Sequence, residues 1–223
     1  MKKGLEIVLL AYPDNPVGKH FIDAFIEADI PLGGVVVETG AGGGTLKRLK
    51  KKIEVDGIRR ACYRLAQVML MKLFRSNVAA TAQKKDIPVY AVKKFNSGTC
   101  KELLQKISPD LLVIASAPIL KKYVFSQARL GCLNAHPGWL PVYRGLGANA
   151  YALKNGDEPG VTVHFIDAGV DTGTIIRRER IPLKSGDTIA KINDRAVARG
   201  AVMVTEVIED VLNDTLVCEK VDE

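Results

Sequence analysis

Four short apolar runs in the first half of the chain constrain the fold more than any other feature. They are rich in β-branched residues and hold few polar positions: LEIVLLA (5–11), GGVVVET (33–39), IPVYAV (87–92) and DLLVIASA (110–117). Strands buried on both faces of a parallel sheet have this composition, whereas strands with one wet face alternate. Apolar residues at helical spacing follow the first and third runs, over 18–30 and 97–107. This alternation predicts an α/β fold with a doubly wound, mostly parallel sheet.

The second half of the chain continues the pattern with shorter signals. Three further strands are expected, at 132–135, 160–166 and 174–183. Asp187 is the expected cap of a long helix that reaches about Leu212. No internal repeat or second domain is evident, so residues 1–223 are interpreted as a single domain. Since ligands of doubly wound sheets bind outside the carboxyl ends of the strands, candidate site residues are sought there.

The composition excludes several classes of protein. Hydrophobic residues make up 47% of the chain and charged residues 26%, as in ordinary soluble domains. No apolar run approaches the roughly 18 residues of a membrane span, and the start of the chain lacks the long apolar region of a signal peptide. The four cysteines are dispersed and only three histidines occur. We therefore expect reduced thiols, a cytoplasmic location and no metal site.

The positive charge is concentrated in one segment. The chain carries a net charge of +7, and residues 46–75 hold ten Lys or Arg against Glu54 and Asp56. This segment follows the glycine run at 40–44, and we interpret about 45–78 as a basic helical insertion. It could be a solvated helix pair that packs on the domain, a contact with anionic lipid, or a contact with nucleic acid through phosphates. An RNA- or membrane-binding protein on an inactive scaffold is the corresponding non-enzyme hypothesis.

The stretch NAHPGWLPVYRG (134–145) brings an Asn and a His together where a strand is expected to end. Asn134 and His136 are two positions apart, so in extended backbone both side chains point to the same side. Pro137 and Pro141 restrict the backbone that follows. An amide donor beside an imidazole suits acyl transfer, since one can hold an oxyanion and the other can carry protons. The alternative is a hydrogen-bonded structural histidine in a rigid turn.

A second polar cluster, DAGVDTG, lies between the strands expected at 160–166 and 174–183. It could be a plain loop with solvated acids. An Asp close to His136 would instead hold the imidazole oriented and charged, and Asp171 is the candidate. No G-x-S-x-G nucleophile elbow is present, so direct attack by an incoming nucleophile is favoured over a covalent enzyme intermediate.

Residues 110–183 together resemble the formyltransferase family that uses 10-formyltetrahydrofolate. The shared features are the N-x-H motif, the proline-containing turn, and a D-x-G motif downstream of the GVTVHF strand, all in the family's order. The resemblance implies a formyltransferase fold with a Rossmann-like N-terminal part. It also implies that Asn134, His136 and Asp171 form the catalytic triad, with 10-formyltetrahydrofolate as co-substrate and no metal.

The resemblance also implies a site for the pterin ring of the folate. Two segments match those with which the family holds the ring, largely through backbone groups. Their residues are Ala117, Pro118, Ile119 and Leu120 in the first, and Ile166, Asp167, Gly169 and Val170 in the second. Two departures fall in the turn after His136, where Gly138 and Trp139 replace the Ser and Leu of many members; they leave the triad intact and could reshape the acceptor side.

The acceptor of the formyl group is narrowed by comparison with the family's subgroups. Glycinamide ribonucleotide formyltransferases carry a G-x-G-S-N phosphate loop after the first strand, and here that stretch reads AYPDNPVG with the acidic Asp14. A phosphate would be poorly received there. Methionyl-tRNA members carry a further C-terminal domain. The preferred acceptor is therefore an amino-sugar nucleotide or another small primary amine, with glycinamide ribonucleotide as the alternative.

Overall fold

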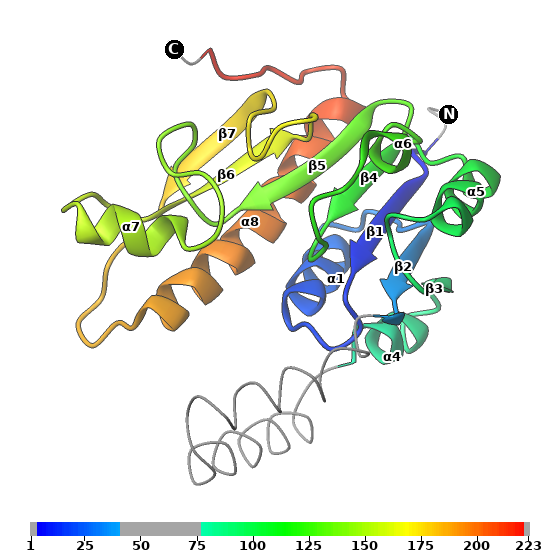
Figure 1. Cartoon of the computed structure of the whole chain (residues 1–223), viewed down its shortest axis with the longest axis horizontal. Helices are drawn as coiled ribbons and strands as arrows, with labels where there is room; N and C mark the ends of the chain where they lie inside the picture. Colours follow the sequence, from blue (N-terminus) through cyan, green and yellow to red (C-terminus); the bar gives the residue numbers. More distant parts are fainter. Residues whose placement is uncertain (1–3, 41–76, 221–223) are drawn as a thin grey trace, which may run out of the picture.

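The computed structural model describes residues 4–40 and 77–220, and a seven-stranded sheet forms its centre (Figure 1). In chain order the strands are β1 (Ile7–Ala11), β2 (Gly34–Glu38), β3 (Val89–Val92), β4 (Leu111–Ile114), β5 (Gly131–His136), β6 (Gly160–Phe165) and β7 (Ile175–Arg180). Their order across the sheet is β3-β2-β1-β4-β5-β6-β7. The first five run parallel, whereas β6 and β7 are antiparallel. The predicted doubly wound, mostly parallel α/β sheet is confirmed.

Helices cover both faces of the sheet. Consecutive strand residues point to opposite sides, and the apolar ones on each side need a helix to bury them. The described helices are α1 (Val17–Glu27), α4 (Val78–Gln83), α5 (Gly98–Ile107), α6 (Lys122–Phe125), α7 (Ala148–Lys154) and α8 (Ile189–Leu212). On one face, α1, α4 and α8 pack on alternate strand residues such as Leu9 and Val113. On the other, α5 and α6 pack on the intervening ones, such as Leu10 and Leu112. The strands β1, β2 and β4 are therefore largely apolar on both sides, whereas β7 carries charged residues.

The cap of α5 is of a residue type that favours helix starts, whereas the cap of α8 corrects a prediction. Ser97 has extended backbone, and its hydroxyl accepts the N–H of Cys100 at 3.2 Å, which makes it the N-cap of α5. The prediction that Asp187 caps the last helix is wrong. Thr188 is the N-cap, while the Asp187 carboxylate accepts hydrogen bonds from the Arg195 guanidinium and the Lys184 N–H. The Asp187 carboxylate is thus paired with a cation about two helical turns further along the chain.

The basic segment, with nearly all of the expected insertion at 45–78, lies outside the described residues. The chain before and after it is anchored at the carboxyl edge of the sheet. Gly40 N–H donates to Lys93 O at 3.0 Å, and Val78 N–H donates to Pro13 O at 2.9 Å. Within the described part of the chain, no helix is long and apolar enough to cross a membrane.

Candidate active site

Strand β5 delivers the two candidate residues of the N-x-H motif to the carboxyl edge. Asn134 and His136 are its third-last and last residues, and the antiparallel partner β6 sets His164 opposite Asn134 and Thr162 opposite His136. The antiparallel strand β6 therefore places a second row of side chains, those of Thr162 and His164, beside the N-x-H motif. Most of the His136 residue is buried, with 6% exposed.

Both ring nitrogens of His136 face groups of the protein. Nδ1 lies 3.4 Å from Asp171 Oδ2, an ion-pair distance, and Nε2 lies 3.0 Å from the backbone oxygen of Tyr143. Because a carbonyl oxygen only accepts, Nε2 carries the proton of that hydrogen bond, and Nδ1 can donate to the carboxylate when the ring is protonated. The ring is thus held from two sides by loops that follow different strands.

Asp171 is placed by its own backbone and by the loop opposite. Its φ of +51° is a left-handed conformation that Asp tolerates better than most residues. Its Oδ2 accepts the N–H of Gly145 at 2.8 Å, and its side chain is 15% exposed. The three residues predicted as a triad, Asn134, His136 and Asp171, are therefore brought to one place, although their sequence separation is up to 37 positions.

His164 joins this cluster and was not singled out from the sequence. Its Nδ1 lies 2.8 Å from Phe165 O and so carries the proton, which leaves Nε2 to accept from the Asn134 amide at 3.1 Å. Burial lowers the pKa of His164, against smaller opposite effects of the Phe165 carbonyl and Asp171. The 3.7 Å separation of Nε2 and Asp171 Oδ1 is therefore not a formed ion pair. The sequence did contain a signal for His164, since a polar residue within the apolar strand GVTVHF needs a hydrogen-bond partner.

The loop between β5 and α7, residues 137–147 and hereafter the site loop, is fastened to β6. Thr162 accepts the N–H of Leu140 at 3.1 Å and donates its hydroxyl to Gly138 O at 2.7 Å. Gly138 is required by the packing, since a Cβ there would lie 2.5 Å from both His136 Nε2 and the Ala148 Cβ. The glycine therefore leaves the space that the His136 ring occupies.

The first segment assigned to the folate follows β4 at the same edge. In it, Leu120 is buried, whereas Ile119 is 70% exposed. The Asn96 side chain fixes this loop with two hydrogen bonds. Its Nδ2 donates to Ile119 O at 2.9 Å, and its Oδ1 accepts the N–H of Lys121 at 2.7 Å. Ala117 packs on the hydrophobic cluster beneath α5.

The second segment follows β6 and is a tightly folded turn. Asp167 Oδ1 accepts the Gly169 N–H at 3.0 Å and the Thr172 hydroxyl at 2.7 Å, so this carboxylate is used within the loop. A Cβ on Gly169 would lie 2.0 Å from that hydroxyl. Val170 is 47% exposed. Ile166 packs on the same cluster as Ala117, so the two segments are close to a common patch of core.

Other chemistry is not supported by the residues nearby. Burial raises the pKa of the Cys132 thiol, two residues before Asn134, far above its ordinary value, which removes it as a nucleophile near neutral pH. Within residues 4–40 and 77–220, no group of three His, Cys, Asp or Glu side chains is arranged to hold a metal ion.

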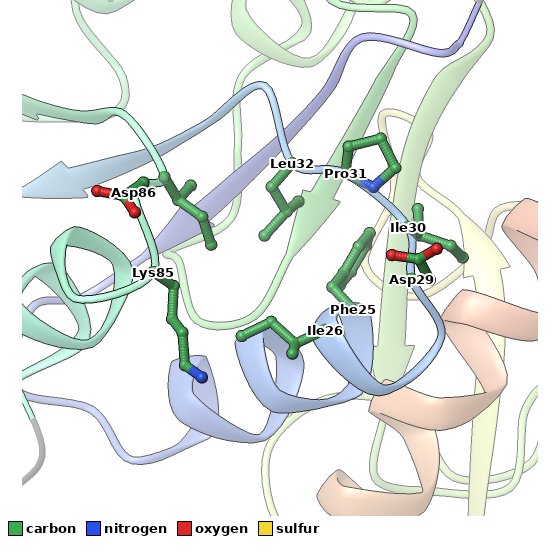
Figure 2. Close-up of a pocket in the computed structure, with 9 residues that line it drawn as sticks. Phe25, Ile26, Asp29, Ile30, Pro31, Leu32, Lys85 and Asp86 are labelled. Carbon is green, nitrogen blue, oxygen red and sulfur yellow. The ribbon is translucent and has the colours of Figure 1, made fainter.

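A groove of about 480 Å³ lies elsewhere, between the end of α1 and the loop before β3 (Figure 2). Phe25, Ile26, Ile30 and Leu32 give it an apolar floor, and Asp29, Lys85 and Asp86 are among its other lining residues. These residues precede β2 and β3, so the groove belongs to the amino edge of the sheet, opposite His136. It offers no His or Asn side chain and is not a candidate for the same chemistry.

Comparison with known proteins places this arrangement in a family. The family model described as formyl transferase matches residues 66–208, which is more than half of the chain. The chain belongs to the formyl transferase family. A methionyl-tRNA formyltransferase of Kosmotoga olearia is 34% identical over 142 residues, which cover 63% of this chain and 46% of that protein. The matched part is thus about half the length of that relative.

Solved structures agree with this family at the level of the fold. A phosphoribosylglycinamide formyltransferase from Anaplasma phagocytophilum is 21% identical and superposes with a TM-score of 0.68, covering 99% of this chain and 97% of that one. A sugar N-formyltransferase from a Shewanella species is 15% identical with a TM-score of 0.63, covering 98% and 74%. By their names these proteins are enzymes of formyl transfer to different acceptors, so the shared fold leaves the acceptor of this chain open.

Proposed function

We propose that this protein transfers the formyl group of 10-formyltetrahydrofolate to a primary amine, without a covalent enzyme intermediate. The observation that carries the proposal is the buried His136–Asp171 pair beside the Asn134 amide at the carboxyl edge of β5. An amide donor, an imidazole and a carboxylate are the groups that attack on a formyl carbon requires: one for the oxyanion and two for the proton.

Each side chain has a distinct role in this proposal. The bound folate supplies the formyl carbon, which the acceptor amine attacks. One N–H of Asn134 is held by His164 Nε2, and its second N–H is left to donate to the developing oxyanion. His136 stabilises the charge and passes a proton from the attacking amine to the folate nitrogen, whose bond to the formyl carbon breaks as tetrahydrofolate leaves. Asp171 orients the imidazole, together with the Tyr143 carbonyl.

The folate is expected to lie between the two segments that follow β4 and β6. The tight turn at Gly169 has no room for a larger side chain, and the exposed side chains of Ile119 and Val170 offer apolar surface to a flat ring. Asp167 is committed to the Gly169 N–H and the Thr172 hydroxyl, so we assign it to shaping the turn. Ala117, Pro118, Leu120 and Ile166 would contribute backbone and packing.

The acceptor is proposed to be an amino-sugar nucleotide or another small amine rather than glycinamide ribonucleotide. Three N–H groups that a phosphate would need after β1 are already hydrogen-bonded within the protein. The N–H groups of Val17, Gly18 and Lys19 at the start of α1 donate to Asn15 Oδ1, Asn15 O and Pro16 O at 3.0, 3.3 and 3.0 Å. An anion there would have to displace these bonds and approach the exposed Asp14.

The experiment that tests the proposal is an acceptor screen with release of tetrahydrofolate as the readout. The acceptors are glycinamide ribonucleotide, two amino-sugar nucleotides and initiator methionyl-tRNA. We expect turnover with an amino-sugar nucleotide. If only glycinamide ribonucleotide gives turnover, it is the acceptor and the proposed amino-sugar nucleotide is wrong. If no acceptor gives turnover, calorimetry shows no folate binding, and RNA binds with an affinity that falls steeply with salt, the protein is a binding module on this scaffold.

A further inference from the structure

The chain after α8 returns to the sheet beside the site loop. This C-terminal segment, residues 213–220, is the red stretch that leads from α8 toward the C-terminus in Figure 1. The Glu219 N–H donates to Ile175 O on the outer strand β7 at 3.0 Å. Leu216 and Cys218 pack against the core cluster that contains α8. The segment is therefore seated on the edge of the sheet by backbone and side-chain contacts.

Its acidic side chain pairs with an arginine in the same row as His136. His136, Thr162 and Arg178 are register partners across β5, β6 and β7. Arg178 Nε lies 3.0 and 2.9 Å from the two carboxylate oxygens of Glu219, and Nη2 donates to Oε1. The Arg178 side chain is only 14% exposed and that of Glu219 is 35% exposed, so the guanidinium is largely buried while its carboxylate partner stays partly in contact with water.

The same guanidinium also holds the site loop. Arg178 Nη1 donates to Leu140 O at 2.7 Å, and the group lies 4.5 Å from the centre of the Trp139 ring. Arg180 lies over the same ring at 3.7 Å. Cations over an indole face are attracted to it, so the stacking on Trp139 and the hydrogen bond to Leu140 O both hold the site loop against β7. The Trp139 departure from the family thus makes a specific contact with β7.

From this anchored point the loop reaches His136 and Asp171. Three residues past Leu140, Tyr143 O accepts from His136 Nε2 at 3.0 Å, and Gly145 N–H donates to Asp171 Oδ2 at 2.8 Å. A displacement of the loop would therefore move the backbone groups that orient both members of the pair. Misplacement of reacting groups by about 1 Å can lower a rate about 10²-fold.

We propose that Glu219 is a positioning residue for the reaction, acting through Arg178 and the site loop on His136. The inference deepens the proposed function and rests on it. Without the carboxylate, the largely buried Arg178 guanidinium has lost its charge partner. It is then expected to move toward solvent, which weakens its contacts with Leu140 O and Trp139. The C-terminal segment is then a working part of the active site, although it lies beyond the last helix.

The test compares Glu219→Gln with Asp210→Asn in the full chain. Asp210 is the matched control, because its carboxylate pairs with Arg177 on the same strand at 2.8 Å and is as exposed as Glu219, 32% against 35%. Arg177 bonds to Glu206 and Asp210 of α8 and not to the site loop. We expect kcat to fall about tenfold in Glu219→Gln, with KM for the folate within about twofold, because a charge-assisted bond is lost away from the folate.

Two further readouts separate positioning from plain support of the fold. Glu219→Asp keeps the charge and should restore most of kcat. In NMR spectra the ring signals of His136 should move in Glu219→Gln, those of His20 should not, and Asp210→Asn should leave both unchanged. A lower Tm with unchanged kcat and unchanged His136 signals would reduce Glu219 to a structural contact. The NMR comparison needs no acceptor, so it still decides the inference if wild-type protein shows no formyl transfer.

Discussion

Two His–Asp pairs in this protein have similar nitrogen–oxygen separations and very different surroundings. His20 Nε2 on α1 lies 3.2 Å from Asp194 Oδ1 on α8, slightly closer than the 3.4 Å between His136 Nδ1 and Asp171 Oδ2. The side chains of the first pair are 33% and 68% exposed, whereas those of the second are 7% and 15% exposed.

A short separation between a histidine and an aspartate does not by itself make a catalytic site. The surface pair is surrounded by water, which screens it and lets both side chains move, so it contributes about 0–1 kcal/mol. The buried pair is fixed by further partners: the Tyr143 carbonyl on the histidine and the Gly145 N–H on the aspartate. Preorganised groups with little water around them are what an acyl-transfer transition state exploits.

The largest expected difference between the pairs is in turnover. His136→Ala and Asn134→Ala should each lower kcat by about 10²-fold or more, the effect of removing one oxyanion donor or proton carrier. His20→Ala is the matched control and should stay within about twofold, as expected for a surface ion pair. Steady-state kinetics with a fixed acceptor, beside circular dichroism of each variant, provides the measurement. A folded His136→Ala protein with normal turnover would remove the histidine from the mechanism.

A smaller effect is expected from disturbing the space around the buried ring. In Gly138→Ala the new methyl group would meet His136 Nε2 and the Ala148 Cβ at 2.5 Å, so the ring or the site loop must shift. We expect kcat to fall about tenfold, since one misaligned hydrogen bond corresponds to about 1–2 kcal/mol. Gly98→Ala is the control, because nothing lies within 4 Å of a Cβ there. Equal kcat values for the two variants would mean that the ring position is not set by Gly138.

The third prediction concerns His164, the histidine that holds Asn134 beside the buried pair, and the dependence of stability on pH. Burial lowers the pKa of His164 in the folded protein, so between the folded and unfolded values the unfolded chain binds more protons. The stabilisation associated with a neutral His164 is present above the unfolded pKa of about 6.5 and is lost as the pH falls from there through the folded pKa. Wild-type protein should therefore lose more unfolding free energy than His164→Gln between about pH 7.5 and 5.5, in urea titrations. Parallel losses in both proteins would argue against the neutral, buried histidine.

The smallest effect on turnover is expected from the basic segment. Changing Lys50, Lys51, Lys52, Arg59 and Arg60 to Gln should leave formyl transfer to a soluble acceptor nearly unchanged. Binding to anionic vesicles or polyanions should weaken, because each basic residue near such a surface contributes about 1 kcal/mol of screened attraction.

The control for the basic segment is removal of the same number of charges from exposed lysines elsewhere, among them Lys106 and Lys154. Vesicle co-sedimentation and the turnover assay are run on both variants. Loss of turnover in the folded basic-segment variant alone would assign these charges to the acceptor site, where they would hold the phosphates of a nucleotide-linked sugar.

Much of the fold could be predicted from the sequence because the central parallel strands β1, β2 and β4 are apolar on both faces. β1 and β2 fall within the runs 5–11 and 33–39, with ends trimmed by about two residues at most. The short helices α6 and α7 were not predicted, since four and seven residues carry too little periodicity. The cap of α8 was misplaced by one residue because Asp187 pairs with Arg195, a contact that local patterns do not encode.

The candidate site was only partly within reach of the sequence. The i, i+2 spacing of Asn134 and His136 foretold that they share a side, and the placement of Asp171 beside them agrees with the family resemblance. His164 was missed because its role depends on the antiparallel register that sets it opposite Asn134. The contacts of Glu219 with Arg178 depend on the path of the chain after α8, which the local sequence does not predict.

The role of the buried His136–Asp171 pair is tested by following a labelled formyl group in Asp171→Asn and in Asp194→Asn. Each substitution removes the carboxylate of one His–Asp pair and nearly preserves its shape. We predict that both proteins bind a reduced folate as the wild type does, and that Asp194→Asn transfers label from 10-formyltetrahydrofolate to the acceptor normally. Transfer by Asp171→Asn should fall about 10²-fold or more. Label transfer at the wild-type rate in a folded Asp171→Asn protein would contradict the account.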